Sequence, residues 1–363
     1  MFRLTALAFG AALMTVTMAP ADAPDLPEGS YHPETGLPYW APGRGEVDHD
    51  AVRRRALEVL ERQFGAFRDA SAALSDTAAA TCTSQSDTEA LKDQLAATWI
   101  AWAPLDSYQF GPIQTLGAAL SVNFWPDAKN YVGRGLAALL AEPADRQADP
   151  AVVMAGSAAA QGLPALEMLL YSDLPVCPAA QGIAAALAQQ GQTLYDAWFA
   201  PDGWADIARA AGPDNPVYQN AAEFTKTLYT AVDFGLIRVE DARLGRPLGT
   251  FDRPFPTRAE AWRSGLSADI IHAQLSGAAE MIERGFAGDI REPDRSWILQ
   301  VIDQAHARLD TVGQPIYDAV QDPTARFRVE ALKQKIEYLR DELARDIGPN
   351  LGVDTGFSAA DGD

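Results

Sequence analysis

The sequence predicts an all-α fold, because the helical pattern recurs along the chain and the strand pattern does not. Near the C-terminal end, apolar residues fall at spacings of three and four between Val329 and Ile347, which gives a helix one buried face. Two capping boxes, at residues 86–89 and 257–260, each precede a stretch with the same spacing. Alternation of apolar and polar residues, which is typical of a half-buried strand, is scarce.

These stretches predict about ten helices. Pro164 favours a helix start, because proline lacks an N–H that the first helical turn would leave unpaired. Asp127 and Asn215 are suited to N-caps, because their side chains accept backbone N–H bonds. The capping boxes predict two further starts, and apolar periodicity supplies the rest. The expected helices cover residues 47–75, 87–107, 127–141, 150–161, 164–171, 178–199, 216–243, 258–285, 294–312 and 323–346.

Long amphipathic helices joined by loops predict two packed helical bundles. A turn-rich zone at residues 200–215 indicates the boundary between them. We therefore expect an N-terminal bundle at residues 47–200 and a C-terminal bundle at residues 201–350. Residues 24–46, rich in proline and glycine, predict an extended lead-in, and residues 351–363 predict a tail.

The N-terminus has the pattern of a secretory signal peptide over residues 1–23. Arg3 precedes an uncharged apolar stretch, and Ala21-Asp22-Ala23 offers a small-residue cleavage site. No cysteine stands near that site, and no other segment has about twenty uninterrupted apolar residues. We expect a periplasmic protein that is exported by this signal, carries no lipid anchor and has no transmembrane segment.

The composition is that of a folded protein that does not bind nucleic acid. Apolar residues make up 48% of the chain, which suits a folded core. The net charge of −20 and the pI near 4.5 argue against nucleic-acid binding, since neutralising phosphates requires clusters of lysine and arginine.

The chain has two cysteines, Cys82 and Cys177. In an oxidising compartment such a pair most simply forms one disulfide. Two free buried thiols are the alternative, and metal ligation by the pair is disfavoured because no histidine is near either cysteine in the sequence.

Several motifs together resemble the imelysin-like family of bacterial envelope proteins. The family signature is a glycine, any residue, a histidine, two residues and a glutamate, and residues 162–167 read GLPALE. Gly162 and Glu167 match this signature, whereas Pro164 stands in place of the histidine. The further motifs, in order, are YQFGP at residues 108–112, FWPD at 124–127 with Asn130, LGRPLG at 244–249, AWRSGLS at 261–267 and the tail at 351–363.

The resemblance implies two packed helical bundles, export and an association with iron acquisition. Some members of the family are described as metallopeptidases, on the basis of the signature histidine and glutamate. Proline cannot ligate a metal or carry a proton, so Pro164 argues against that chemistry here. The chain has four histidines: His32, His49, His272 and His306. None of them is followed by glutamate or histidine three or four residues later. A zinc site is therefore not expected.

Two carboxylates remain as candidate metal ligands. The resemblance implies that Glu167 is a ligand or polar site residue, while its place in a first helical turn also suits the helix dipole. Asp127 is either the N-cap of its helix or a second carboxylate at the bundle interface. Oxygen-only sites suit calcium, magnesium or ferric iron, which leaves iron or calcium open as a cofactor.

Arg263, Ser264 and Ser267 are the candidate ligand-binding residues. In a helix, an arginine and two hydroxyls at this spacing could bind an anionic or carboxylate group. The alternative is a salt bridge between helices.

We interpret the chain as an exported imelysin-like protein that binds a ligand or partner in iron acquisition and is not a peptidase. Envelope proteins of an iron-uptake system would be its partners. Two alternatives stay open. One is a metal-dependent peptidase, and the other is an envelope scaffold without a small-molecule site.

Overall fold

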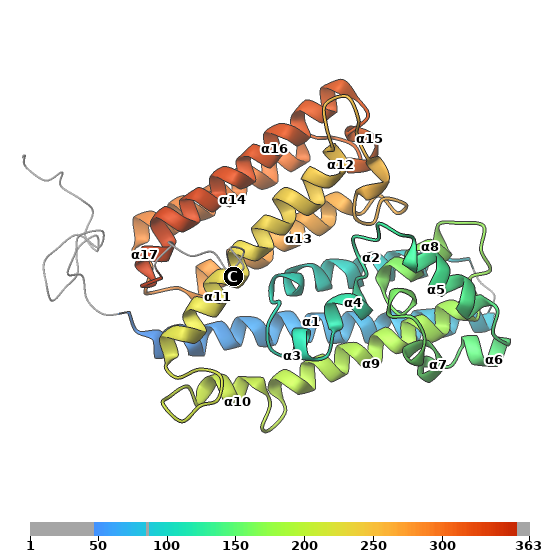
Figure 1. The fold of residues 1–363 in the computed structure, drawn as a ribbon, viewed down its shortest axis with the longest axis horizontal. Coiled ribbons are helices and arrows are strands. Elements are labelled where there is room, and N and C mark those ends of the chain that lie inside the picture. The colour runs from blue at the N-terminus through green and yellow to red at the C-terminus, as the bar shows by residue number, and fades with distance from the viewer. Residues whose placement is uncertain (1–46, 85–86, 354–363) are drawn as a thin grey trace, which may run out of the picture.

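The computed structural model describes residues 47–84 and 87–353, which form helices and connecting loops (Figure 1). The only β-type pairing within these ranges is an isolated bridge between Thr250 and Arg253, so the all-α prediction is confirmed. No helix in the described part is long and apolar enough to cross a bilayer. The expected signal peptide, all of the lead-in and most of the C-terminal tail lie outside the described residues.

The first layer is built on α1 (His49–Ser84), which packs along α9 (Ala179–Phe199) and against α2 (Glu89–Trp102). The buried face of α1 carries Phe64 and Phe67, whose rings contact Trp198 of α9 and Trp102 of α2. In the described part of the chain, six shorter α-helices lie between α2 and α9 in the sequence: α3 (Pro112–Thr115), α4 (Ala118–Val122), α5 (Tyr131–Leu140), α6 (Ala144–Gln147), α7 (Pro150–Ala155) and α8 (Leu163–Leu170).

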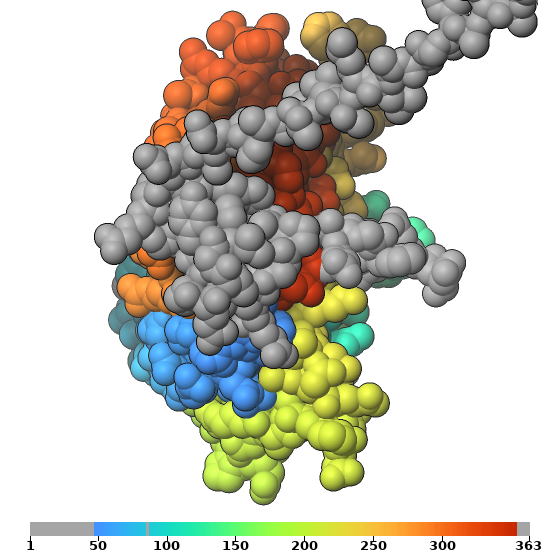
Figure 2. All heavy atoms as spheres, turned by 90° about the vertical axis from the view of Figure 1, so that its left-hand side faces the viewer, coloured from blue at the N-terminus to red at the C-terminus, as the bar shows by residue number. Residues whose placement is uncertain are grey.

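The second layer contains α13 (Ser267–Glu280), α14 (Glu292–Asp310) and α16 (Pro323–Glu342), with α14 packed on α16. Figure 2 shows the orange and red residues of these later helices stacked above the blue residues of α1. Shorter helices complete this layer: α12 (Arg246–Leu248), α15 (Ile316–Ala319) and α17 (Gly348–Asn350).

The two layers are joined by α11 (Ala221–Ile237), which contacts α1 on one side and α13 and α16 on the other. The chain reaches it from α9 through residues 200–220, which contain only the short helix α10 (Trp204–Arg209). A 3₁₀ turn at Ala103–Ser107 also packs against α13. Buried apolar side chains of both layers form one continuous cluster, so the division at residue 200 stays a prediction.

Two predicted helix starts were wrong by five residues or more, and the helix expected from residue 127 begins at Tyr131. We expected Asn215 to cap a helix at residue 216, but its Oδ1 accepts the N–H groups of Val217 and Tyr218 in a turn. The helix starts at Ala221, where Asn220 is the cap and accepts the N–H of Glu223 at 3.1 Å. Both asparagines have the chemistry of a cap, so local sequence does not distinguish them.

The second error concerns residues 258–285. Ala259 is extended, with ψ of 138°, and α13 begins only at Ser267. Glu260, the last residue of the expected capping box, is buried and bonds to side chains far away in the sequence. The tertiary contacts of Glu260 therefore replace the local cap.

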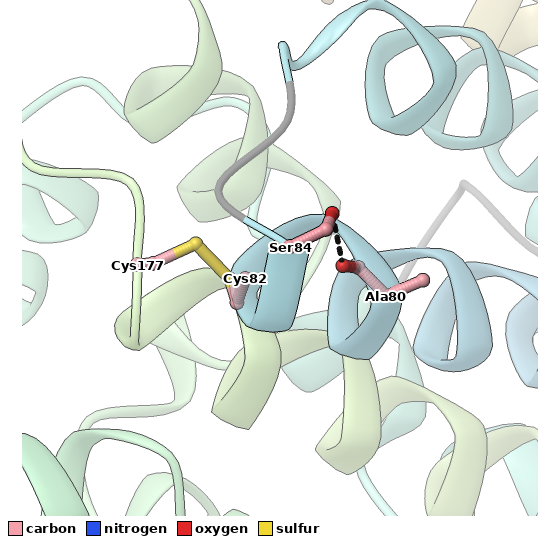
Figure 3. Close-up of a disulfide and its surroundings, with 4 residues drawn as sticks. All are labelled: Ala80, Cys82, Ser84 and Cys177. Carbon is pink, nitrogen blue, oxygen red and sulfur yellow. Dashed lines mark hydrogen bonds between the residues drawn. A yellow bond between two sulfur atoms is a disulfide. The ribbon is translucent and has the colours of Figure 1, made fainter.

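The predicted disulfide is confirmed. Cys82, in the last turns of α1, is bonded to Cys177, which lies just before α9 (Figure 3). The two Cα atoms are 5.6 Å apart and the cysteines are 95 residues apart in the sequence. The bond thus ties the C-terminal end of α1 to the N-terminal end of α9, the two helices that form the base of the first layer.

Candidate functional site

A cleft of about 500 Å³ lies between the two layers. On one side it is lined by residues 124–132 and by α8. On the other side it is lined by residues 257–263 and by Arg246 at the start of α12. Pro164, Glu167, Asp127 and Arg263 all line it, so the structure brings together residues of both predicted sites.

The GLPALE motif is placed at the cleft by close packing at Gly162. A Cβ atom there would lie 2.1 Å from the carbonyl oxygen of Val122, so a larger residue would push α8 away. Helix α8 then begins at Leu163, with Pro164 in its first turn. Pro164 and Glu167 are one turn apart and both line the cleft, so the proline ring takes the place where the family signature would put an imidazole.

Glu167 is bound by two of the predicted ligand-binding residues. Its carboxylate is 2% exposed, and Oε1 accepts the backbone N–H groups of Arg263 and Ser264 at 3.0 and 2.9 Å. The Ser264 hydroxyl donates to the same oxygen at 2.8 Å. The Arg263 guanidinium lies 3.7 Å from Oε2, which neutralises charge without a short hydrogen bond. The anion held by this turn is therefore the protein's own carboxylate.

Ser267 is placed differently from Arg263 and Ser264. Its hydroxyl donates to the carbonyl oxygen of Glu260, and its residue opens α13. Residues 260–266 form a turn, with Gly265 in the left-handed region at φ of 77°. The three residues were expected one turn into a helix, but Arg263 and Ser264 lie in the turn before α13 and only Ser267 is helical.

Asp127 caps α5. Its Oδ1 accepts the N–H of Tyr131 at 2.8 Å and, more weakly, that of Lys129 at 3.3 Å. Its Oδ2 accepts the N–H of Val132 at 2.8 Å. Both carboxylate oxygens thus accept backbone N–H groups at a helix start, as a cap does, although Asn130 and not Asp127 occupies the N-cap position.

The cleft does not fit a directly bound metal. Asp127 would have to give up N–H donors to coordinate one, and the only Glu167 oxygen without a hydrogen bond, Oε2, faces the Arg263 guanidinium at 3.7 Å. The described part of the chain contains no group of three or more histidine, cysteine, aspartate or glutamate side chains placed to hold a metal ion. Arginine, the remaining charged residue type of the cleft, repels cations.

None of the three described histidines lines the cleft. His49 Nδ1 is 3.0 Å from the Thr225 hydroxyl, near the start of α1. His272 and His306 join α13 to α14, with their Nδ1 atoms 2.6 Å apart. His32 lies outside the described residues.

A buried charge cluster beside the cleft was not predicted. Arg243 is 1% exposed and lies in a π-helical turn that follows α11. Its Nε donates to Glu260 Oε2 at 2.6 Å, and one Nη donates to Asp106 Oδ2 at 2.9 Å. The Nε of Arg238 also donates to Asp106 Oδ2, at 2.7 Å, so two arginines pair with this carboxylate. The cluster connects the first layer to the turn that forms one wall of the cleft.

The same cluster continues through neutral donors. Glu260 Oε1 accepts from the Asn123 amide at 2.6 Å and from the Trp99 indole at 3.2 Å. Arg243 also donates to Gln274, whose amide donates to Ser107 at 2.6 Å. Losing one partner of such a buried cluster destabilises the fold, because the remaining charges have lost their hydration and are left uncompensated.

Arg246 and Arg258 also line the cleft and were not among the predicted site residues. The sequence held one signal for them. Residues 238–263 contain six arginines against four acidic residues, in a chain whose net charge is −20. That local excess of arginine marks the segment that forms the second-layer wall.

Burial raises the pKa of the Glu167 carboxyl, although its bonds to Ser264 and Arg263 oppose the shift. A raised pKa means that the folded chain takes up this proton at a higher pH than the unfolded chain does. Lowering the pH toward about 4.5, the ordinary value, should therefore stabilise the native protein relative to Glu167→Gln, which does not titrate.

The measurement is the free energy of unfolding of both proteins in denaturant across that pH range. The difference in favour of the native protein should grow as the pH falls and level off below about 4.5. A difference that shrinks instead would mean that the hydrogen bonds outweigh burial and that the pKa of Glu167 is lowered.

Comparison with known proteins places this geometry in context. Residues 62–343 match the family model described as Imelysin. An imelysin-like protein from Psychrobacter arcticum 273-4 superposes with a TM-score of 0.71 at 18% identity, over 86% of this chain and 99% of that one. A putative iron-regulated protein A precursor from Parabacteroides distasonis superposes with a TM-score of 0.63 at 14% identity, over 85% and 98%. No curated protein matches the chain.

Proposed function

The chain belongs to the imelysin family, and from this membership we propose that it is an exported ligand-binding protein of iron acquisition without peptidase activity. The single observation that carries the proposal is the state of the signature residues. Glu167 is bound by Arg263 and Ser264, and Pro164 replaces the histidine.

Hydrolysis by a metallopeptidase needs a metal that polarises the peptide carbonyl and a base that activates water. The residues of this cleft supply neither in a free form. Glu167 accepts three hydrogen bonds on one oxygen, and Asp127 accepts backbone N–H groups on both. What the cleft offers is an apolar surface with arginine side chains at its wall, which suits binding more than bond cleavage.

The link to iron rests on the family and on the fold shared with the putative iron-regulated protein A precursor. Export to the periplasm rests on the signal pattern of residues 1–23. In this proposal, envelope proteins of an iron-uptake system are the partners that deliver or receive the ligand.

We expect no cleavage when the purified protein is incubated with a denatured, fluorescently labelled protein in the presence of zinc, iron or calcium. Pro164→His is the matched variant, because it restores the signature histidine one turn before Glu167. Cleavage by the native protein that is abolished by a chelator and by Glu167→Gln would refute the proposal and support the peptidase alternative.

The iron link is tested in the native host. Deleting the gene should slow growth under iron limitation, and iron supplementation should restore it. Growth that is unaffected by iron, together with the absence of any bound small molecule, would favour the scaffold alternative.

A further inference from the structure

The cleft between the layers carries an excess of positive charge. Three of its five charged residues are arginines, Arg246, Arg258 and Arg263, in a strongly acidic chain. The two acidic residues, Asp127 and Glu167, are neutralised by donors of the chain itself. Among the described residues, no carboxylate lies within ion-pair distance of Arg246 or Arg258. The cleft therefore favours an anion.

Two of these arginines stack on aromatic rings, and of the two only Arg263 also faces a carboxylate, that of Glu167 at 3.7 Å. The guanidinium of Arg258 lies over the Phe255 ring at 3.8 Å, and that of Arg263 lies over the Trp262 ring at 4.4 Å. Stacking orients a guanidinium through its flat face and leaves the N–H groups along its edge available. Less side-chain freedom is then lost when an anion binds.

The turn that carries Arg263 already binds a carboxylate. Glu167 accepts its backbone and hydroxyl donors, with the guanidinium of Arg263 at 3.7 Å. Oxygen anions of planar geometry are the partners that arginine pairs with at two points. The lining also includes the apolar Phe124, Trp125 and Pro164 and the polar Asn130 and Thr257. The volume of about 500 Å³ suits a small organic molecule.

We propose that this cleft binds a ferric chelate of an organic polycarboxylate, with the outer carboxylates of the chelate facing Arg258, Arg263 and Arg246. The inference rests on the proposed role in iron acquisition and names its ligand class. A chelate brings its own oxygen ligands for iron, so the protein needs none. This explains how a protein of iron acquisition can present arginines where metal ligands would be expected.

The test is equilibrium dialysis of the full-length mature protein against radioactively labelled ferric citrate in excess citrate. We expect saturable retention of iron, weakened by rising ionic strength because the contact is between charges. Arg258→Gln should weaken retention about tenfold or more, the usual effect of losing a charged hydrogen bond. Arg246→Gln provides an independent second variant, since both side chains are exposed and removable without disturbing the core.

Arg284→Gln is the matched control, because Arg284 is exposed and lies outside the cleft. It should retain iron like the native protein. An uncharged ferric trihydroxamate, offered in the same way, should not be retained. Retention of both chelates alike, retention unchanged by Arg258→Gln and Arg246→Gln, or no retention of ferric citrate would each overturn the inference. If dialysis fails while the deletion strain still depends on iron, the ligand class is wrong and the proposed function stands.

Discussion

Arg243→Met should lower the free energy of unfolding by about 3–5 kcal/mol, the cost of leaving buried charges without their counter-ion. Asp106 and Glu260 are 2% and 1% exposed and both pair with Arg243. Burial by itself lowers the pKa of Arg243, but the ion pairs with Glu260 and Asp106 outweigh it and raise the pKa, so the guanidinium stays charged. After the substitution Asp106 keeps Arg238, whereas Glu260 keeps only neutral donors.

The measurement is unfolding in denaturant, followed by tryptophan fluorescence at fixed pH. Arg209→Met is the control, because Arg209 forms an ion pair with Asp206 in which both side chains are about half exposed. Exposed pairs contribute at most about 1 kcal/mol, so this variant should unfold almost like the native protein. Equal losses in the two variants would show that the cluster around Arg243 is hydrated and does not hold the layers together.

Replacing both Cys82 and Cys177 by alanine should lower the free energy of unfolding by about 4–5 kcal/mol. The disulfide closes a loop of 95 residues, and the chain-entropy model gives this value for a loop of that length. The bond restricts the unfolded chain, so the effect should be present even though α1 and α9 remain packed. The same unfolding experiment measures it.

A reducing agent supplies the control for this prediction. It should destabilise the native protein by as much as the double substitution does, and it should leave the double variant unchanged. A loss below about 1 kcal/mol in both cases would contradict the entropy argument and mean that the unfolded chain is already compact in this region.

Much of the fold could be predicted from local sequence. The apolar stripe of residues 329–347 and the position of Pro164 predicted helices that are present in α16 with the turn after it, and in α8. The disulfide followed from the number of cysteines and the expected compartment. These predictions succeeded because helix periodicity and proline chemistry act within one or two turns of the chain.

The turn at residues 260–266 shows where such reasoning fails. Its sequence has a capping box and apolar periodicity, which predict a helix from residue 258. In the fold, Glu260 binds Arg243, Asn123 and Trp99. Losing a local cap costs about 1 kcal/mol, whereas leaving a buried charge without its partner costs about 3–5 kcal/mol. Tertiary contacts therefore decide the backbone of the cleft wall.

The sequence by itself determined the helical class, the disulfide, the family and the loss of the signature histidine at Pro164. Only the tertiary structure decided what the remaining site residues do. Glu167 and Arg263 are 96 residues apart in the chain, and Arg243 and Asp106 are 137 apart. Charges so distant meet only when the layers pack, and packing then determines which are neutralised within the protein and which remain for a ligand.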